Sequence, residues 1–222
     1  MNDLWSPIGL SLKCALVSVV LNLPWGLFWG WVFARKNFFG KSLLQTALYL
    51  PLVLPPVLTG YFLLEILSAR APLGHWLQEV WGIRFVLDWK GAMLASAVVA
   101  SPFMIQTVRH SLTQMDARLE MAARNLGAGF WRVAATITLP LCWRGIVAGM
   151  MLVFARSIGE FGASVIVAGS IPHKTQTIPL AIYSHVILGR EEAIWPLVAA
   201  AIGFAYVGLM ISELFDRTEK RT

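Results

Sequence analysis

Two opposite charges four residues apart, Arg156 and Glu160, stand inside an otherwise apolar block of the sequence. At that spacing both side chains lie on one face of a helix. A charge inside a bilayer costs about 2.5–3.5 kcal/mol, so such a residue usually faces a partner or a cavity. Two interpretations are open: an internal ion pair that fixes the helix in a bundle, or a pathway in which Arg156 attracts a dianion while Glu160 limits its trapping.

Hydroxyl side chains extend the list of candidate pathway residues. Ser157 and Ser164 lie in the same block as the charges, and Thr59 lies in an earlier one. Each can donate a weak hydrogen bond to an anion, although such residues commonly bond to helix backbone instead. The candidate translocation-pathway residues are Thr59, Arg156, Ser157, Glu160 and Ser164.

No catalytic motif accompanies these residues. The four histidines include no pair at metal-ligand spacing, and no HExxH, CxxC or GxSxG sequence occurs. Cys14 and Cys142 are isolated in the sequence and are expected to be small buried hydrophobes. A Walker A sequence is also absent, so any ATP hydrolysis must come from another chain. We expect neither an enzyme nor a metal or cofactor bound by this chain.

The composition places these residues in a membrane protein. Hydrophobic residues make up 57% of the 222 residues and charged residues only 14%, whereas a soluble domain has about 25% charged residues. The net charge of +6 is explained by Lys and Arg on cytoplasmic loops. Nucleic acid is therefore not expected as a partner, and the chain is expected to form one compact multi-pass bundle in the lipid bilayer.

Five apolar blocks are long enough to cross a bilayer, which takes about 20 residues per helix. Pro51, Pro55 and Pro56 predict a kink or break in the second block, whose freed backbone groups need partners inside the bundle. The expected spans are residues 8–34, 43–67, 91–110, 143–167 and 194–215.

Two less apolar segments separate these spans on the outer side. Residues 68–90 have apolar residues at roughly helical spacing, which predicts either a helix lying on the membrane surface or a docking surface for an external partner. Residues 168–192 are expected to be external and re-entrant in part, because their apolar run is too short to span.

The basic residues orient the predicted spans. With the N-terminus outside and the C-terminus in the cytoplasm, eleven of the eighteen Lys and Arg residues fall inside and five outside, as the positive-inside rule requires. The inside set is Arg35, Lys36, Lys41, Arg109, Arg118, Arg124, Arg132, Arg144, Arg217, Lys220 and Arg221. Residues 111–140 are thereby predicted to lie in the cytoplasm.

That cytoplasmic segment has the pattern of a short helix followed by a sharp turn. Apolar residues recur at three- and four-residue intervals after Asp116, which can cap the helix alone or together with Thr113. Gly127 and Gly129 can end the helix, since glycine accepts the left-handed backbone conformation of a helix C-terminus. A second helix leading to Pro140 would complete a rigid elbow that another protein surface can approach.

The same segment resembles the E-A-A-x3-G-x9-I-x-L-P loop of bacterial ABC-importer permeases. The resemblance implies a coupling helix that inserts into a cleft on an ATPase subunit. One residue departs from the pattern, because the acid is displaced by one position to Glu120, which is expected to meet a basic residue on the ATPase. The implied ATPase-coupling residues are Glu120, Ala122, Ala123, Gly127, Ile137, Leu139 and Pro140.

Two further stretches, residues 50–67 and 155–184, resemble the permease subunit of bacterial molybdate importers. The most specific parts are GEFG at 159–162 and the TQTIPLAIY run at 175–183. Residues 169–172 read GSIP where the family leads us to expect GNIP. Sulfate and tungstate permeases are similar in the same regions, so these oxyanions are alternative substrates.

The resemblance implies the type I ABC-importer permease (MetI-like) fold, an all-α transmembrane bundle in one domain of the bacterial inner membrane. Five spans cannot enclose a substantial pore, and one elbow offers one docking point. We therefore expect a symmetric homodimer on two cytoplasmic ATP-binding subunits, which hold ATP-Mg. The resemblance also implies a periplasmic or extracellular oxyanion-binding protein.

Other classes of function remain as alternatives. A stand-alone secondary anion transporter predicts inverted repeats and activity without ATP. A purely structural membrane subunit accounts for neither the elbow nor the proline-rich second block.

Overall fold

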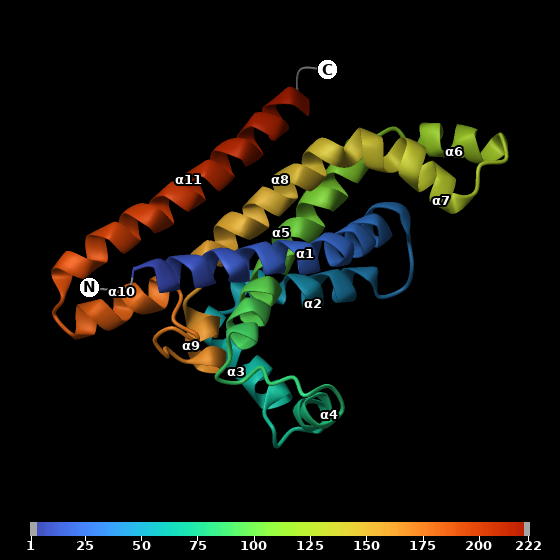
Figure 1. Cartoon of the computed structure of the whole chain (residues 1–222). Helices are drawn as coiled ribbons and strands as arrows, with labels where there is room; N and C mark the ends of the chain where they lie inside the picture. The colour runs from blue at the N-terminus through green and yellow to red at the C-terminus, as the bar shows by residue number, and fades with distance from the viewer. Residues whose placement is uncertain (1–3, 220–222) are drawn as a thin grey trace.

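The computed structural model describes residues 4–219 of the chain, with side chains through Leu214. The basic residues Arg217, Lys220 and Arg221 of the topology prediction lie outside the described side chains. Every regular element of the described residues is helical (Figure 1), so the predicted all-α class is confirmed.

Four stretches of helix are long and apolar enough to cross a membrane. The first, third and fifth predicted spans each lie within one long helix. These four stretches are α1 (Trp5–Arg35), α5 (Trp89–Gln114), the run from α7 (Phe130–Val133) through the π-helical turn η1 (Ala134–Thr138) to α8 (Leu139–Ile158), and α11 (Ile194–Glu219).

The bundle is built on α1, α5 and α8, which pack against one another, while α11 lies along α8 (Figure 1). Glycine permits the close approach of α1 to α5, because a Cβ atom at Gly30 would lie 2.6 Å from the Val108 side chain. Buried polar groups also join the two helices: the Asn22 amide donates a hydrogen bond to the Ala97 carbonyl oxygen at 3.0 Å.

The second predicted span is broken, as its prolines indicated. It forms α2 (Lys41–Val53) and α3 (Pro56–Leu67), whose axes differ by 112°. Leu54 and Pro55 between them are extended, with ψ of 143° and 130°, because a proline disfavours the helical region for the residue before it. The bend directs α3 against α9 (Gly162–Ala168), and a Cβ atom at Gly60 would lie only 2.7 Å from the Cα of Ala163.

The predicted fourth span, residues 143–167, begins inside a longer helix but is wrong at its end, because α8 ends at Ile158. Three residues then separate α8 from α9. Within this break the side chain of Glu160 accepts a hydrogen bond from the backbone at the start of α9, as described below.

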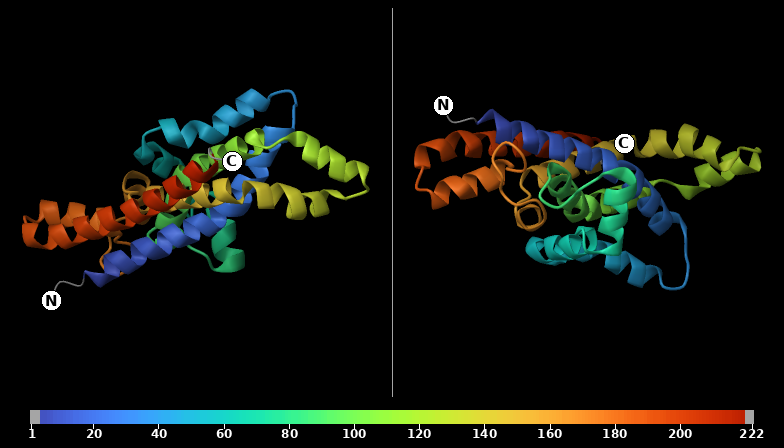
Figure 2. Two further views of the ribbon diagram at one scale, coloured as in Figure 1. Left: turned by 90° about the horizontal axis from the view of Figure 1, so that it is seen from above. Right: turned by 60° about the horizontal axis from the view of Figure 1, so that its bottom comes forward.

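Shorter helices occupy the segments between the spans. The helix predicted within residues 68–90 is present as α4 (Pro72–Trp81), and α10 (Ile178–Ile187) and the 3₁₀ turn η2 (Glu191–Ala193) precede α11. The elbow built from α6 (Ala117–Asn125) and α7 projects at one end of the molecule, and the turn from α10 to α11 lies at the other (Figure 2).

Candidate functional site

The first half of the elbow is a short helix with a defined start and end. The carboxylate of Asp116 accepts a hydrogen bond from the backbone N–H of Arg118 at 2.9 Å, which caps α6 as predicted. Thr113 takes no part in this cap, because its hydroxyl donates to the carbonyl oxygen of His110.

A Schellman motif ends α6 and turns the chain. Gly127 has a φ of +86°, and its N–H donates to the Arg124 carbonyl oxygen at 2.9 Å, while Ala128 N–H donates to that of Ala123 at 3.0 Å. The prediction that Gly127 ends the helix is confirmed. Gly129 instead lies at the start of α7, where its φ is −67°.

The second half of the elbow is continuous with a membrane helix. α7, η1 and α8 form one uninterrupted helical run in which Pro140 lies in the first turn of α8. The predicted second helix leading to Pro140 is therefore present, and it continues beyond this residue into the membrane helix. The wider π turn of η1 accommodates the change of hydrogen-bond register that a proline without an N–H imposes. The elbow and α8 therefore share one continuous helical run.

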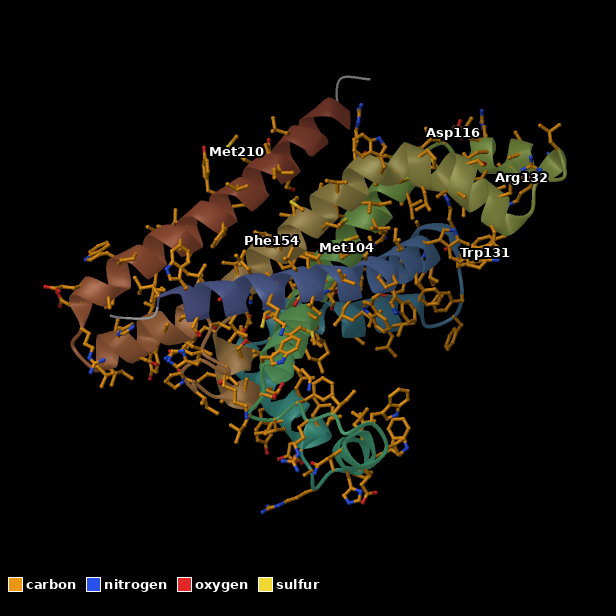
Figure 3. All side chains as sticks on the ribbon, in the orientation of Figure 1. Met104, Asp116, Trp131, Arg132, Phe154 and Met210 are labelled. Carbon is orange, nitrogen blue, oxygen red and sulfur yellow. The ribbon has the colours of Figure 1, made fainter. Side chains whose placement is uncertain are left out.

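An exposed apolar surface covers the end of the elbow. Leu126 is 89% exposed and Trp131 is 82% exposed, and Figure 3 shows Trp131 and Arg132 on this projecting end. A Cβ atom at Gly127 would meet nothing within 4 Å, so the turn itself is open to an approaching surface. Of the predicted coupling residues, Ala122, Leu139 and Pro140 are exposed, whereas Ala123 and Ile137 are half-buried.

Glu120 does not belong to this exposed surface. It is only 7% exposed, its Oε2 lies 3.0 Å from Nε of Arg35, and its Oε1 accepts a hydrogen bond from the Thr138 hydroxyl at 2.8 Å. The expectation that Glu120 meets a base on an ATPase is therefore wrong for this structure. The displacement of the acid by one residue rotates it by about 100° around the helix, and the exposed position beside it is occupied by Met121.

Few contacts attach the elbow to the membrane helices. The ring of Phe130 packs edge-on against Trp31 of α1, with centroids 5.2 Å apart. Beside these contacts lies a cavity of about 740 Å³ whose lining from α1, α5, α8 and the elbow is almost entirely apolar. The Arg35–Glu120–Thr138 cluster is therefore the main polar link between α1 and the elbow among the described residues.

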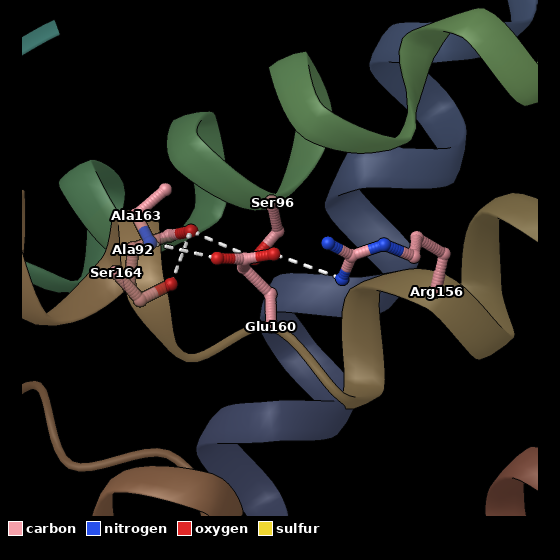
Figure 4. A network of polar contacts seen from close by, with 6 residues as sticks. All are labelled: Ala92, Ser96, Arg156, Glu160, Ala163 and Ser164. Carbon is pink, nitrogen blue, oxygen red and sulfur yellow. Dashed lines mark hydrogen bonds and ion pairs between the residues drawn. The ribbon is translucent and has the colours of Figure 1, made fainter. Parts of the chain in front are cut away.

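The second candidate site lies where α8 breaks. Oε2 of Glu160 lies 2.8 Å from Nη1 of Arg156, so the predicted ion pair is present. Its other oxygen, Oε1, accepts a hydrogen bond from the backbone N–H of Ala163 at 2.8 Å, and Glu160 is only 2% exposed (Figure 4). One carboxylate thus joins the last turn of α8 to the first turn of α9.

Three of the five predicted pathway residues meet in this network. The Ser164 hydroxyl donates to the Ala92 carbonyl oxygen of α5 at 3.5 Å, and the Ser96 hydroxyl donates to the same oxygen at 2.9 Å (Figure 4). The hydroxyls of Thr59 and Ser157 are buried and form no hydrogen bond within the described part of the chain. The pathway role of these residues remains a prediction.

The fold and the elbow define the class of this protein as the membrane permease subunit of a type I ABC importer. The chain belongs to the family described as binding-protein-dependent transport system inner membrane component, whose model matches residues 22–222. It is therefore an inner-membrane protein.

Individual relatives show which importer permeases the chain is similar to. The chain is 47% identical over 218 residues to the molybdenum transport system permease protein ModB of Haemophilus influenzae, covering 97% of this chain and 95% of that protein. It is 32% identical over 223 residues to the sulfate transport system permease protein CysW of Escherichia coli K12, covering 99% and 76%. Its fold matches a crystal structure of a bacterial alginate ABC transporter in complex with an alginate pentasaccharide-bound periplasmic protein, with a TM-score of 0.71, 18% identity and coverage of 100% and 80%.

Proposed function

We propose that this chain is the permease subunit of an ATP-driven importer that carries molybdate across the inner membrane. The observation that supports this substrate most is the 47% identity to a molybdenum permease over nearly the full length of both chains. The identity to a sulfate permease is lower, 32%, and covers less of that protein.

In this proposal two copies of the chain enclose the path between them and rest on two cytoplasmic ATP-binding subunits. The N-terminus lies outside and the C-terminus in the cytoplasm, which places the elbow on the side of the ATPases. This chain supplies no catalytic residue, and ATP-Mg is held by the partner. A periplasmic oxyanion-binding protein delivers the anion. ATP binding draws the two elbows together and opens the path outward, and hydrolysis returns it inward.

The structure provides two physical connections for this movement. The continuous run from α7 to α8 carries it into the membrane on the same helix. The Arg35–Glu120 ion pair and the Thr138 hydrogen bond carry it to the end of α1. An apolar surface around Leu126 and Trp131 is suited to burial in a cleft on the ATPase, since exposed apolar patches mark interaction sites.

Transport by the reconstituted complex tests the substrate. The permease, its ATPase and its binding protein are placed in proteoliposomes, and uptake of labelled molybdate is measured with unlabelled molybdate, tungstate or sulfate as competitor. We expect molybdate to compete most effectively and sulfate to compete weakly. Sulfate competing as well as molybdate would instead favour a sulfate permease.

A further inference from the structure

A polar stripe lies on α5 close to the elbow, outside both sites described above. Gln106, Arg109, His110 and Thr113 follow one another at intervals of three, one and three residues, which places them on one face of the helix. Together with Tyr49 of α2 they line a cleft of about 530 Å³. The cleft is therefore formed by two helices that the proline break brings side by side.

The lining carries a positive charge that no acid neutralises. Arg109 takes part in none of the ion pairs formed by the described side chains, and no carboxylate lines the cleft. The Tyr49 hydroxyl is buried and has no hydrogen-bond partner among the described residues. The Tyr49 hydroxyl can therefore donate a hydrogen bond to a group in the cleft without giving up another bond.

The other polar groups are partly engaged with one another. His110 Nε2 lies 2.9 Å from the side-chain nitrogen of Gln114, and the Thr113 hydroxyl donates to the His110 carbonyl oxygen at 2.8 Å. The guanidinium of Arg109, the phenol of Tyr49 and the amide of Gln106 thus remain as donors toward the cleft. A guanidinium with neutral donors beside it suits a tetrahedral oxyanion, because its N–H groups bind paired oxygens.

The cleft lies at a different depth from the Glu160 network. Both sites involve α5, but Ala92 and Arg109 are separated along this helix by roughly 25 Å at 1.5 Å per residue. The stripe occupies the end of α5 that leads directly into α6. In the proposed orientation this end faces the cytoplasm.

We propose that Arg109, with Tyr49 and Gln106, forms a transient binding site for the transported oxyanion at the cytoplasmic mouth of the path. This proposal rests on the proposed function, because it takes the cargo to be a tetrahedral dianion. A single uncompensated guanidinium beside neutral donors attracts such an ion and still releases it. The site therefore favours exit toward the cytoplasm over retention in the membrane.

Charge restoration at position 109 tests this site. Arg109→Cys is treated, before reconstitution with ATPase and binding protein, with a methanethiosulfonate that adds either a quaternary ammonium or an uncharged methyl group. We expect the untreated variant to take up molybdate at least about tenfold more slowly than wild type, since hydrogen bonds to charged groups contribute about 1.5–3 kcal/mol. The cationic reagent should recover most of this loss and the neutral reagent none, while Arg109→Lys should stay within about threefold of wild type.

Matched controls isolate the effect of the charge at position 109. Wild-type protein receives both reagents, since Cys14 and Cys142 are buried. Lys41→Cys removes a cation from α2 outside the cleft and should transport normally with either reagent. If the neutral reagent recovers uptake as well as the cationic one, the volume of the side chain and not its charge acts at position 109, and this result would overturn the proposal.

These outcomes distinguish a failure of the proposed transport function from a failure of the proposed Arg109 site. Wild-type uptake in the same vesicles tests the proposed function by itself. If wild type transports molybdate and Arg109→Cys does so equally well, only the Arg109 site is wrong. If Arg109→Cys stays inactive with the cationic reagent and Arg109→Lys is also inactive, the role of Arg109 is structural and the site is rejected.

Discussion

At Glu120 a single buried carboxylate joins three parts of the chain. It pairs with Arg35 at the end of α1, it belongs to α6, and it accepts a hydrogen bond from Thr138 of η1. Removing one partner of a buried ion pair leaves the other charge without compensation and typically costs about 3–5 kcal/mol, whereas removing both can be nearly neutral. The energetic coupling between Arg35 and Glu120 is therefore measurable.

We predict that Glu120→Ala and Arg35→Ala each lower the melting temperature of the purified permease–ATPase complex. The double variant should lose less stability than the two single variants lose in sum, with a coupling energy of about 1–3 kcal/mol. Met121→Ala, at the exposed position beside Glu120, is the matched control and should melt like wild type. Strictly additive effects at positions 35 and 120 would show that the pair does not link α1 to the elbow.

A second residue-scale prediction decides between the two interpretations of Arg156 and Glu160. Glu160 both pairs with Arg156 and caps α9, which favours a structural role. Glu160→Gln should lower thermal stability because it leaves Arg156 without its counter-charge. The double variant Arg156→Gln/Glu160→Gln should recover part of that loss and keep molybdate uptake within about threefold of wild type. A stable double variant without uptake would instead support the pathway role.

At the scale of elements, the elbow is a surface feature whose turn can be altered without disturbing the packing. A side chain at Gly127 would enter open space, so its cost to folding is confined to the positive φ, about 1–2 kcal/mol. The same side chain would project where an ATPase cleft is expected. Folding and coupling can therefore be separated at this position.

We predict that Gly127→Leu keeps the permease folded but lowers ATP-driven uptake and binding-protein-stimulated ATP hydrolysis at least about tenfold. Gly189→Leu is the matched control, since Gly189 also has a positive φ and open space around it but lies between α10 and α11. The measurement is ATP hydrolysis by the reconstituted complex with and without loaded binding protein. Unchanged stimulation in Gly127→Leu would contradict the coupling role of the elbow.

Local signals in the sequence were sufficient for some elements. Pro55 and Pro56 act on the backbone beside them, so the break between α2 and α3 was predictable. Gly127 likewise ends α6 through its own left-handed backbone conformation, which is a local property of glycine. The lengths of the apolar blocks were enough to predict α1, α5 and α11, because a helix that spans a bilayer has a minimum length.

Contacts between distant segments explain the structural features that could not be predicted from the sequence. The position of α9 depends on its packing against α3 and α5, and an apolar run in the sequence continues through the break between α8 and α9. The inward position of Glu120 depends on Arg35, which lies far earlier in the chain. The cleft at Arg109 depends on the proximity of α2 to α5, although the polar spacing on α5 was already visible.

At the scale of the whole molecule, the described residues of one chain form a single elbow and five spans at most. We predict that the detergent-solubilised permease is a dimer and that its complex contains two permease and two ATPase chains. Native mass spectrometry should give a permease mass of twice the chain's 24.6 kDa. A single 24.6 kDa permease chain bound to its ATPase would contradict the symmetric arrangement.

The central claim, that this chain imports molybdate by coupling to an ATPase, is tested most directly by the energy requirement of uptake. Proteoliposomes with permease, ATPase and loaded binding protein are filled with ATP-Mg or with a non-hydrolysable ATP analogue, and the initial rate of labelled molybdate uptake is measured. We expect accumulation against a gradient with ATP and none with the analogue. Equal uptake in both would contradict the central claim and indicate a stand-alone transporter or channel.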